Sequence, residues 1–301
     1  MSAVDREDED IEGSRAPLLE HLTELRTRLI VCTVAVVLAF ILCFAFSQQI
    51  YLFLVEPFTV AAQIIAQQRA GGGHAGPFDV LFALTGIRSV AGAPPPDLTL
   101  IFTAPLEFFF TRMRLAGFGA IILTFPVLAW QLYRFVAPGL YRRERRAFLP
   151  FLLAAPFLFL LGAALVYYVM LPFILWFSLS QEVTGAAGPG GVNVQLLPKV
   201  SDYLSLVTTL LLSFGLCFQL PVVLSLAGLA GLVSSQQLRA GRKYAIVGIV
   251  AVAAFVTPPD PISQIMLSVP IILLYEVAIW CVRLMELRRT REDEAADAAL
   301  V

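Results

Sequence analysis

Long uncharged apolar runs constrain this chain more than any other feature. The runs at residues 29–46 and 147–177 contain no Asp, Glu, Lys or Arg. A helix needs about 20 mostly apolar residues to cross the hydrocarbon core of a bilayer. Only 14% of the residues are charged and 58% are hydrophobic, whereas about a quarter of a soluble domain is charged. The sequence therefore predicts an all-α, polytopic membrane protein.

Six membrane-spanning helices are predicted, and the last two are expected to be short. The spans are expected at residues 29–46, 115–133, 147–177, 203–233, 244–256 and 262–282. As a helix, the fifth run would rise only about 20 Å, against about 30 Å of hydrocarbon. From Pro17 onwards, leucines recur at helical spacing and predict an amphipathic helix that runs into the first span.

The membrane domain is expected at residues 17–284, with a tail on either side and two further segments within it. Residues 1–16 are polar and acidic and are expected to form a disordered cytoplasmic tail, as are residues 285–301. Tracts of glycine and of proline predict an enlarged outer loop at about 58–100. A helix at the outer surface is expected at residues 101–114.

The distribution of basic residues predicts the orientation in the membrane. On this map, the tails and the two inner loops hold fifteen of the 21 Lys and Arg residues, and the outer segments hold five. Loops rich in Lys and Arg stay in the cytoplasm. Both termini are therefore predicted to be cytoplasmic.

One of these inner loops, at residues 135–146, contains more than orientation requires. Pro138 and Gly139 favour a turn, and four arginines supply the charge that keeps the loop cytoplasmic. Glu144 is explained by neither need. From the residues alone, its carboxylate either tempers a basic loop or binds a cation.

Four short motifs follow one another along the chain. They are residues 21–29 (His-Leu-Thr-Glu-Leu-Arg-Thr-Arg-Leu), residues 135–146, Leu220-Pro221, and Thr257-Pro258-Pro259-Asp260 with Gln264. In this order they resemble the TatC family, the large subunit of the twin-arginine protein translocase: the first is similar to its amino-terminal motif, the second to its first cytoplasmic loop and the others to its later motifs. The resemblance covers about residues 17–57 and 100–289. Two departures are the enlarged outer loop and Gln219, which stands where many members have a glutamate.

The resemblance implies a multi-pass protein of the inner (plasma) membrane that acts as a receptor and not as an enzyme. It would bind twin-arginine signal peptides of folded cargo and assemble single-span TatA- and TatB-type partners for export driven by the proton motive force. A homo-oligomer within a receptor complex is implied, surrounded by lipid and without nucleic acid. No catalytic residue, metal or cofactor is expected.

The resemblance also implies two sets of site residues. The signal-peptide-binding residues would be Glu24, Leu25, Arg26, Phe135, Pro138, Tyr141, Glu144 and Arg145. The partner-docking residues would be Gln219, Asp260 and Gln264.

Simpler interpretations stand beside these roles. Glu24 precedes Arg28 by four positions, so the two side chains can form a surface ion pair. Gln219 lies near mid-membrane and either bonds across helices within the chain or meets a partner helix, and Gln264 is similar. Glu276 lies about two helical turns before Arg283, which predicts a pair between them.

A secondary transporter is the alternative function, because proline-broken spans with polar residues can form a binding site at the membrane midplane. Against it, the sequence shows no internal repeat and no charge pair in mid-membrane. An intramembrane hydrolase needs a Ser-His or Asp-Asp pair in the spans, and the predicted spans contain none.

The predicted orientation can be tested with single cysteines and a membrane-impermeant thiol reagent added outside intact cells. Cysteines placed at Gly139 and Ala240 should be shielded, because both positions lie in inner loops. A cysteine at Gly72 should be labelled, because it lies in the outer loop. Labelling at Gly139 would overturn the orientation.

Overall fold

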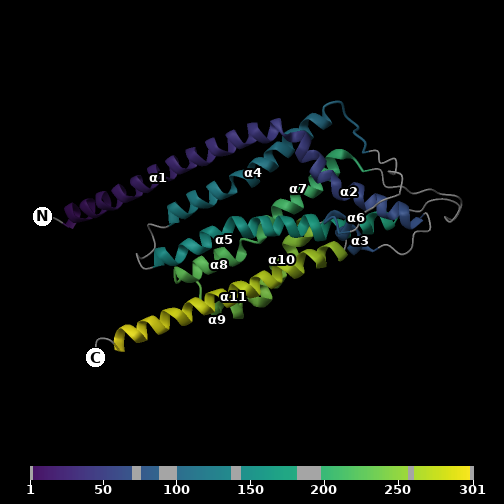
Figure 1. Cartoon of the computed structure of the whole chain (residues 1–301). Coiled ribbons are helices and arrows are strands. Elements are labelled where there is room, and N and C mark those ends of the chain that lie inside the picture. Colours follow the sequence, from purple (N-terminus) through teal and green to yellow (C-terminus); the bar gives the residue numbers. More distant parts are fainter. Residues whose placement is uncertain are drawn as a thin grey trace.

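The computed structural model describes residues 3–69, 76–87, 100–136, 144–181, 198–256 and 261–298. Within these ranges the chain is helical, apart from connecting turns and one isolated β-bridge between Ile101 and Lys199. The helices run roughly along one long axis, and both termini lie at the same end of the molecule (Figure 1). We call this end the terminal end. The predicted all-α class is confirmed.

The described residues form eleven α-helices and one π-helical turn. In chain order they are α1 (Ala3–Ala45), α2 (Ser47–Arg69), α3 (Pro77–Leu84), α4 (Glu107–Val136), α5 (Glu144–Leu165), the π-helical turn η2 (Val166–Met170), α6 (Leu171–Ser180), α7 (Val200–Cys217), α8 (Leu220–Leu229), α9 (Ser235–Ala240), α10 (Arg242–Val256) and α11 (Pro261–Ala298).

Six helical stretches of the described chain are long and apolar enough to cross a membrane. They are Leu22–Ala45, Ser47–Gln68, Glu107–Leu132, Leu153–Ser180, Val200–Leu229 and Gln264–Arg288. These stretches agree with a six-span polytopic protein. The predicted fifth span is not among them, because it forms α10, which has 15 residues and rises about 22 Å.

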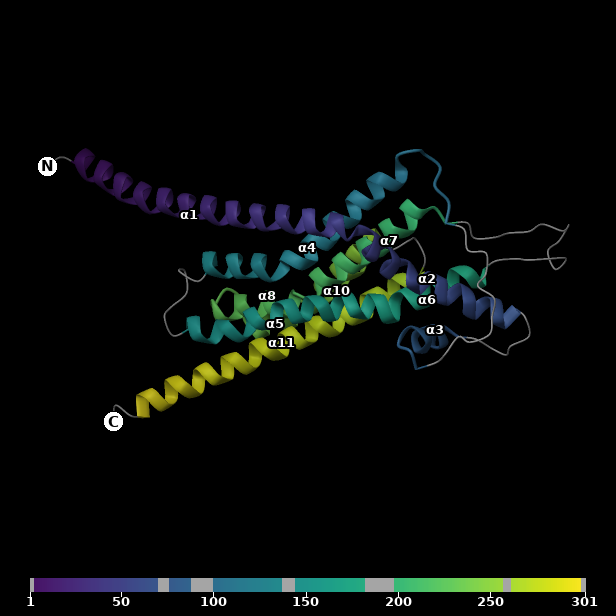
Figure 2. The same cartoon turned by 45° about the horizontal axis from the view of Figure 1, so that its top comes forward.

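Helix α2 is the largest departure from the predicted map. The loop expected from residue 58 begins later, because α2 continues to Arg69. Leu54, Phe58, Ala61 and Ile65 recur at spacings of four, three and four, and all four are at most 5% exposed. This stripe packs into the core and stabilises the helix. Together with α3 and α6, α2 lies at the end opposite the termini (Figure 2).

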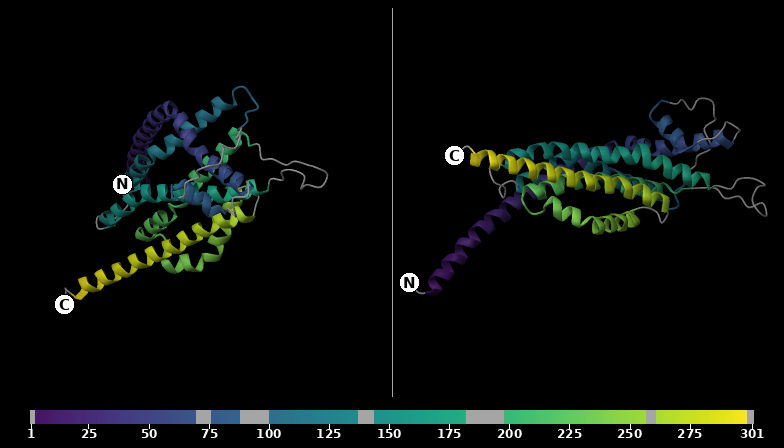
Figure 3. Two further views of the ribbon diagram at one scale, coloured as in Figure 1. Left: turned by 45° about the vertical axis from the view of Figure 1, so that its right-hand side comes forward. Right: turned by 90° about the horizontal axis from the view of Figure 1, so that it is seen from below.

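The outermost helices also extend beyond their predicted limits. α1 begins at Ala3 and α11 ends at Ala298, so most of the two expected disordered tails is helical. The beginning of α1 is rich in Asp and Glu. Negative charge near the N-terminus of a helix stabilises it through the helix dipole. The N-terminal part of α1 extends away from the bundle (Figure 3).

Proline interrupts the fourth predicted span but not the third. The predicted fourth span divides into α7 and α8 at Phe218 and Gln219. Pro221 follows directly, and its missing N–H interrupts the helical hydrogen bonds there. The predicted third span is unbroken in direction through α5, η2 and α6 (Figure 1). The surface helix expected at residues 101–114 is not separate, because its second half forms the first turns of α4.

Close packing of α5 on α7 forms the centre of the bundle. A Cβ atom added at Gly162 would lie 2.8 Å from the carbonyl oxygen of Phe214, and one at Gly215 would lie 2.6 Å from the ring of Phe159. Only glycine permits this approach, as is common where helices meet in membranes. The packing fully buries Phe214. Two other extensive contacts, α1 on α4 and α8 on α11, complete the arrangement.

A proline inside α2 leaves a backbone carbonyl that another helix satisfies. Pro57 has no N–H, so the carbonyl of Phe53 has no partner within the helix. The hydroxyl of Tyr167, in η2, donates to this carbonyl at 2.8 Å. The hydroxyl of Tyr203, in α7, donates to the next carbonyl, of Leu54, also at 2.8 Å. Two buried tyrosines therefore join three helices next to Pro57.

Polar contacts also join the helices at the end opposite the termini. The carboxylate of Glu107, at the start of α4, accepts from the backbone N–H of Thr103 at 2.7 Å and from the hydroxyl of Ser201, in α7, at 2.5 Å. Arg112 donates from two nitrogens, at 2.9 and 2.8 Å, to the buried hydroxyl of Ser47 at the start of α2. These contacts fix the beginning of α4 against both neighbours.

The bond from Tyr167 to the carbonyl of Phe53 can be tested with Tyr167→Phe. This change keeps the ring stacked on Phe53 and leaves a buried carbonyl without its donor, which should lower the free energy of unfolding by about 1–2 kcal/mol. Tyr168→Phe is the matched control, because that side chain is 38% exposed and should change stability by less than about 0.5 kcal/mol. Unfolding in detergent measures both. Equal losses in the two variants would mean that the hydroxyl of Tyr167 is not stabilising.

Candidate functional site

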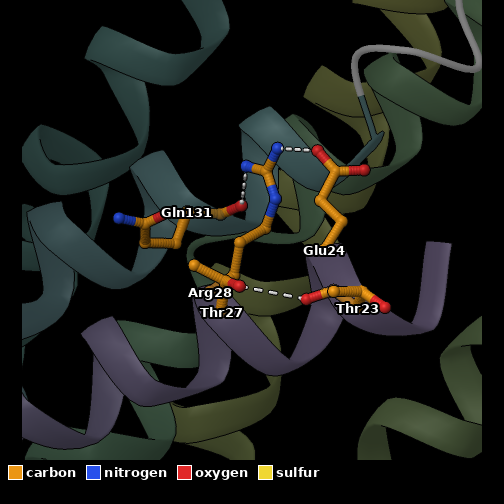
Figure 4. A network of polar contacts seen from close by, with 5 residues as sticks. All are labelled: Thr23, Glu24, Thr27, Arg28 and Gln131. Atoms are coloured by element: carbon orange, nitrogen blue, oxygen red, sulfur yellow. Dashed lines mark hydrogen bonds and ion pairs between the residues drawn. The ribbon is translucent and has the colours of Figure 1, made fainter. Parts of the chain in front are cut away.

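The amino-terminal motif meets the end of α4 at the terminal end of the bundle. Nη2 of Arg28 donates to the carboxylate of Glu24 one helical turn earlier, and Nη1 donates to the backbone carbonyl of Gln131, in α4, at 3.4 Å (Figure 4). The side chain of Arg28 is 14% exposed and that of Glu24 is 38% exposed. The simple ion pair expected from the sequence is therefore present, and the same arginine also contacts a second helix.

The neighbours of Glu24 in the motif point elsewhere on α1. Leu25 is 41% exposed and Arg26 is also exposed. Thr27 donates its hydroxyl back to the carbonyl of Thr23 at 3.0 Å, within the helix (Figure 4). The motif thus presents one ion-paired carboxylate towards α4 and leaves an apolar and a basic side chain accessible.

The predicted loop residues can be placed only through the backbone. Phe135 lies in the last turn of α4, and Glu144 and Arg145 begin α5. The side chains of these three residues, and Pro138 and Tyr141 altogether, lie outside the described residues. The end of α4 and the start of α5 are both at the terminal end (Figure 1). The fold therefore brings the ends of the predicted loop to the region where Arg28 contacts α4.

Gln219 forms a bond within the chain, which is one of the two alternatives that the sequence left open. Its side chain is 8% exposed, and its Nε2 donates to the backbone carbonyl of Ala155, in α5, at 2.9 Å. The amide lies where α7 ends and α8 begins. Its bond is therefore made across helices within the chain, next to the break in the fourth predicted span.

Of the other two docking candidates, the structure describes only Gln264, which lies away from the terminal end. Gln264 is half-buried at the beginning of α11, and its Nε2 lies 3.4 Å from the carbonyl of Val250, in α10. This distance is long for a hydrogen bond. Asp260 lies outside the described residues. Gln264 therefore joins α10 to α11 only weakly.

Glu276 has a different partner from the one predicted. It pairs with Arg242, at the start of α10, at 2.7 Å. The sequence predicted Arg283, which is seven residues further along the same helix and about 10 Å away along its axis. A charge on the adjacent helix is closer than one two turns away, and no local pattern in the sequence could show it. Nearby, Glu286 accepts from the N–H of Ser235 at the start of α9.

A separate apolar cavity of about 600 Å³ lies between α1, α2, α4, α5, η2 and α7. Cys43 and Gly119 are among its lining residues, together with the side chains of Phe53 and Leu160. Cys43 is nineteen positions after Glu24, which corresponds to about 28 Å of helix. The cavity is therefore remote from the ion pair. Among the described residues, no group of three or more His, Cys, Asp or Glu side chains is placed to hold a metal ion.

The bond made by Gln219 leads to a stability prediction. Gln219→Leu removes the donor and leaves the carbonyl of Ala155 with one partner fewer in a buried position, so the protein should lose about 1 kcal/mol of stability. Gln264→Leu serves as the control, because its contact is long and half-exposed, and it should change stability less. Thermal unfolding of the two purified variants and the wild type measures these changes in stability. A Gln219→Leu protein as stable as the wild type would show that the amide is not needed for packing.

Comparison with known proteins identifies the family. Residues 20–270 match the model of the family described as "Sec-independent protein translocase protein (TatC)". The TatC protein of Magnetococcus marinus is 39% identical over 290 residues, covering 96% of this chain and 92% of that protein. The TatC protein of Escherichia coli is 32% identical over 264 residues, 88% and 87% of the two chains.

Solved structures agree with this assignment. The crystal structure of the twin arginine translocase receptor TatC matches with a TM-score of 0.64 and 29% identity, covering 88% of this chain and 98% of that one. A second crystal structure of this receptor, in DDM, matches with a TM-score of 0.66 and 30% identity over 86% of this chain. The chain therefore belongs to the TatC family and is a multi-pass inner-membrane subunit of the Sec-independent (Tat) protein translocase, a transport component and not an enzyme.

Proposed function

We propose that this subunit is the receptor for twin-arginine signal peptides, with the binding site on the cytoplasmic side at the terminal end of the bundle. The observation that carries the proposal is the position of Glu24. Its carboxylate is half-exposed on α1, beside an arginine that contacts the end of α4. Glu144 begins the next helix, α5, after the intervening loop. Two carboxylates thus belong to helix segments that converge on one end of the molecule.

The chemistry of the ligand suits two carboxylates. A signal peptide with two adjacent arginines presents two guanidiniums, and each is a planar fork of N–H donors that fits a carboxylate with two bonds. In the proposal, Glu24 and Glu144 each receive one arginine. The apolar and aliphatic parts of the peptide pack on Leu25, Phe135 and Tyr141.

The basic residues of the site have supporting roles in the proposal. Arg26 and Arg145 face lipid phosphates, which lie at the level of the inner membrane surface. Pro138 holds the loop in a turn. The role of Arg26 agrees with its exposed position on α1. The proposed roles also explain how a loop rich in arginine can belong to a site for a cationic peptide.

Assembly with TatA- and TatB-type single-span partners completes the proposed function, within a homo-oligomeric receptor complex that exports folded cargo with the proton gradient. Of the three docking candidates, Gln264 and Asp260 best suit a partner helix. Gln264 lies at the edge formed by α10 and α11 and has only a long contact within the chain. Gln219 is bonded inside the chain, so its part in docking is limited to holding the break between α7 and α8.

The structure gives less support to a secondary transporter. Such a protein needs convergent polar groups around a cavity at the membrane midplane. The cavity between α1, α2, α4 and α5 is lined almost entirely by apolar side chains. The polar side chain of Gln219 is already bonded to Ala155. Neither feature of the described chain supplies a site for an ion or a polar solute.

The proposed roles of the carboxylates can be tested by measuring the affinity of the purified protein for a labelled signal peptide. A charge-assisted bond contributes about 1.5–3 kcal/mol, so Glu144→Ala should weaken binding by about ten- to a hundredfold. Glu144→Gln should fall between wild type and Glu144→Ala, and Glu144→Arg should be worst because it adds repulsion. Glu276→Gln is the control, because it is also an ion-paired carboxylate, 36% exposed, but on α11. It should leave binding unchanged.

A double-mutant cycle then shows whether the contact is direct. It combines Glu144→Gln with a peptide in which the two arginines are replaced by lysines. Strong coupling between the two changes supports a direct contact. Strict additivity, with both single changes weakening binding, would mean that Glu144 shapes the loop and that another group holds the arginines.

A further inference from the structure

The carboxylate of Glu24 is already occupied in the structure. Arg28 donates to it from Nη2, and the two side chains belong to consecutive turns of α1 (Figure 4). A guanidinium is the group that the proposed function assigns to the signal peptide at this position. The protein therefore carries its own guanidinium at the place where an incoming arginine would bind.

The environment of Arg28 makes it a poorly satisfied occupant. Its side chain is 14% exposed, and its Nε atom is buried with no hydrogen-bond partner among the described residues. Its Nη1 contact with the carbonyl of Gln131 is long, at 3.4 Å. A guanidinium has five N–H donors, and Arg28 places few of them well. The charge of Glu24 is therefore the main interaction that fixes the position of the Arg28 guanidinium.

We propose that Arg28 is a built-in competitor for the signal peptide, which occupies Glu24 at rest and is displaced when an arginine of the peptide binds. This inference rests on the proposed function of Glu24. Displacement exchanges one guanidinium for another, so the affinity for the peptide depends on the difference between the two contacts. A peptide arginine that bonds both carboxylate oxygens replaces an arginine that bonds one, and this difference favours the peptide.

Displacement would also change the contact between helices. In the resting arrangement, Arg28 joins Glu24 on α1 to Gln131 near the end of α4. When Glu24 turns to the peptide, Arg28 loses its charged partner and keeps only the long contact with Gln131. In the proposal, binding therefore leaves the guanidinium that contacts the end of α4 without the charge that positions it, and α4 leads into the cytoplasmic loop.

A purely structural role for Arg28 predicts the opposite sign. If the arginine serves only to hold α1 on α4 and to orient Glu24, its removal weakens peptide binding. If it competes, its removal tightens binding. The two roles can be separated by one affinity measurement, provided that the general effect of removing a positive charge is controlled.

The experiment measures binding of a labelled Arg-Arg signal peptide to the full-length protein in lipid nanodiscs. Arg28→Gln should tighten binding by about two- to tenfold, as expected when an ion pair of modest strength no longer competes. Arg134→Gln is the matched control, because Arg134 is exposed in the last turn of α4 and its loss changes the charge equally. The control should change binding by less than about twofold. Unchanged or weaker binding in Arg28→Gln would overturn the proposal.

Two further variants make the result specific. Arg28→Lys keeps the charge but offers a single-point contact in place of a fork, so it should tighten binding less than Arg28→Gln does. In a Glu24→Gln protein, Arg28→Gln should have no further tightening effect, because there is no carboxylate left to release. Equal tightening with and without Glu24 would mean that Arg28 acts only through its charge. If Glu24→Gln alone leaves binding unchanged, the proposed role of Glu24 fails, independently of Arg28.

Discussion

The absence of water in a bilayer requires every backbone polar group within the membrane to find a partner inside the protein. Regular helices meet this requirement alone, but this chain breaks its helices at several points. At two of these points a side chain bonds the interrupted helix to another helix. Tyr167 donates to the carbonyl of Phe53, which Pro57 leaves without its helical donor, and Tyr203 donates to the next carbonyl. Gln219, at the break between α7 and α8, donates to α5. These bonds join helices that are distant in the chain and so help to fix the arrangement of the bundle.

Charged groups obey a related constraint. A charge near the hydrocarbon must be paired or must reach the membrane surface. The described pairs, Glu24 with Arg28 and Glu276 with Arg242, each involve the helices that leave the bundle at the terminal end. Both carboxylates are a little over one third exposed. The same kind of ion pair, a carboxylate with an arginine, thus occurs twice, and the two pairs differ in their surroundings. Arg28 reaches the end of α4, which leads to the loop containing Glu144, whereas Arg242 begins a short helix next to α11.

The sequence predicts what depends on local spacing. Apolar runs predicted five of the six stretches that can cross a membrane, and the separation of four residues predicted the pair between Glu24 and Arg28. Other features depend on neighbours that are distant in the chain. The continuation of α2 to Arg69 follows from burial of one face against other helices, and the partner of Glu276 lies 34 positions away. The contact between Arg28 and Gln131 spans 103 positions, so the sequence could identify the carboxylate and its local partner but not the second helix that they meet.

Under the proposed function, the occupied carboxylate has a thermodynamic consequence for binding and release. An arginine that arrives at an unpaired carboxylate would gain the whole stabilisation of a new ion pair. With Arg28 in place, the carboxylate of Glu24 already has a charged partner. In the proposed competition, the peptide gains only the difference between two guanidinium contacts, while the geometry of the fork retains selectivity. A resting ion pair would then keep recognition specific and binding reversible, because the group that the peptide displaces remains one helical turn away and can return.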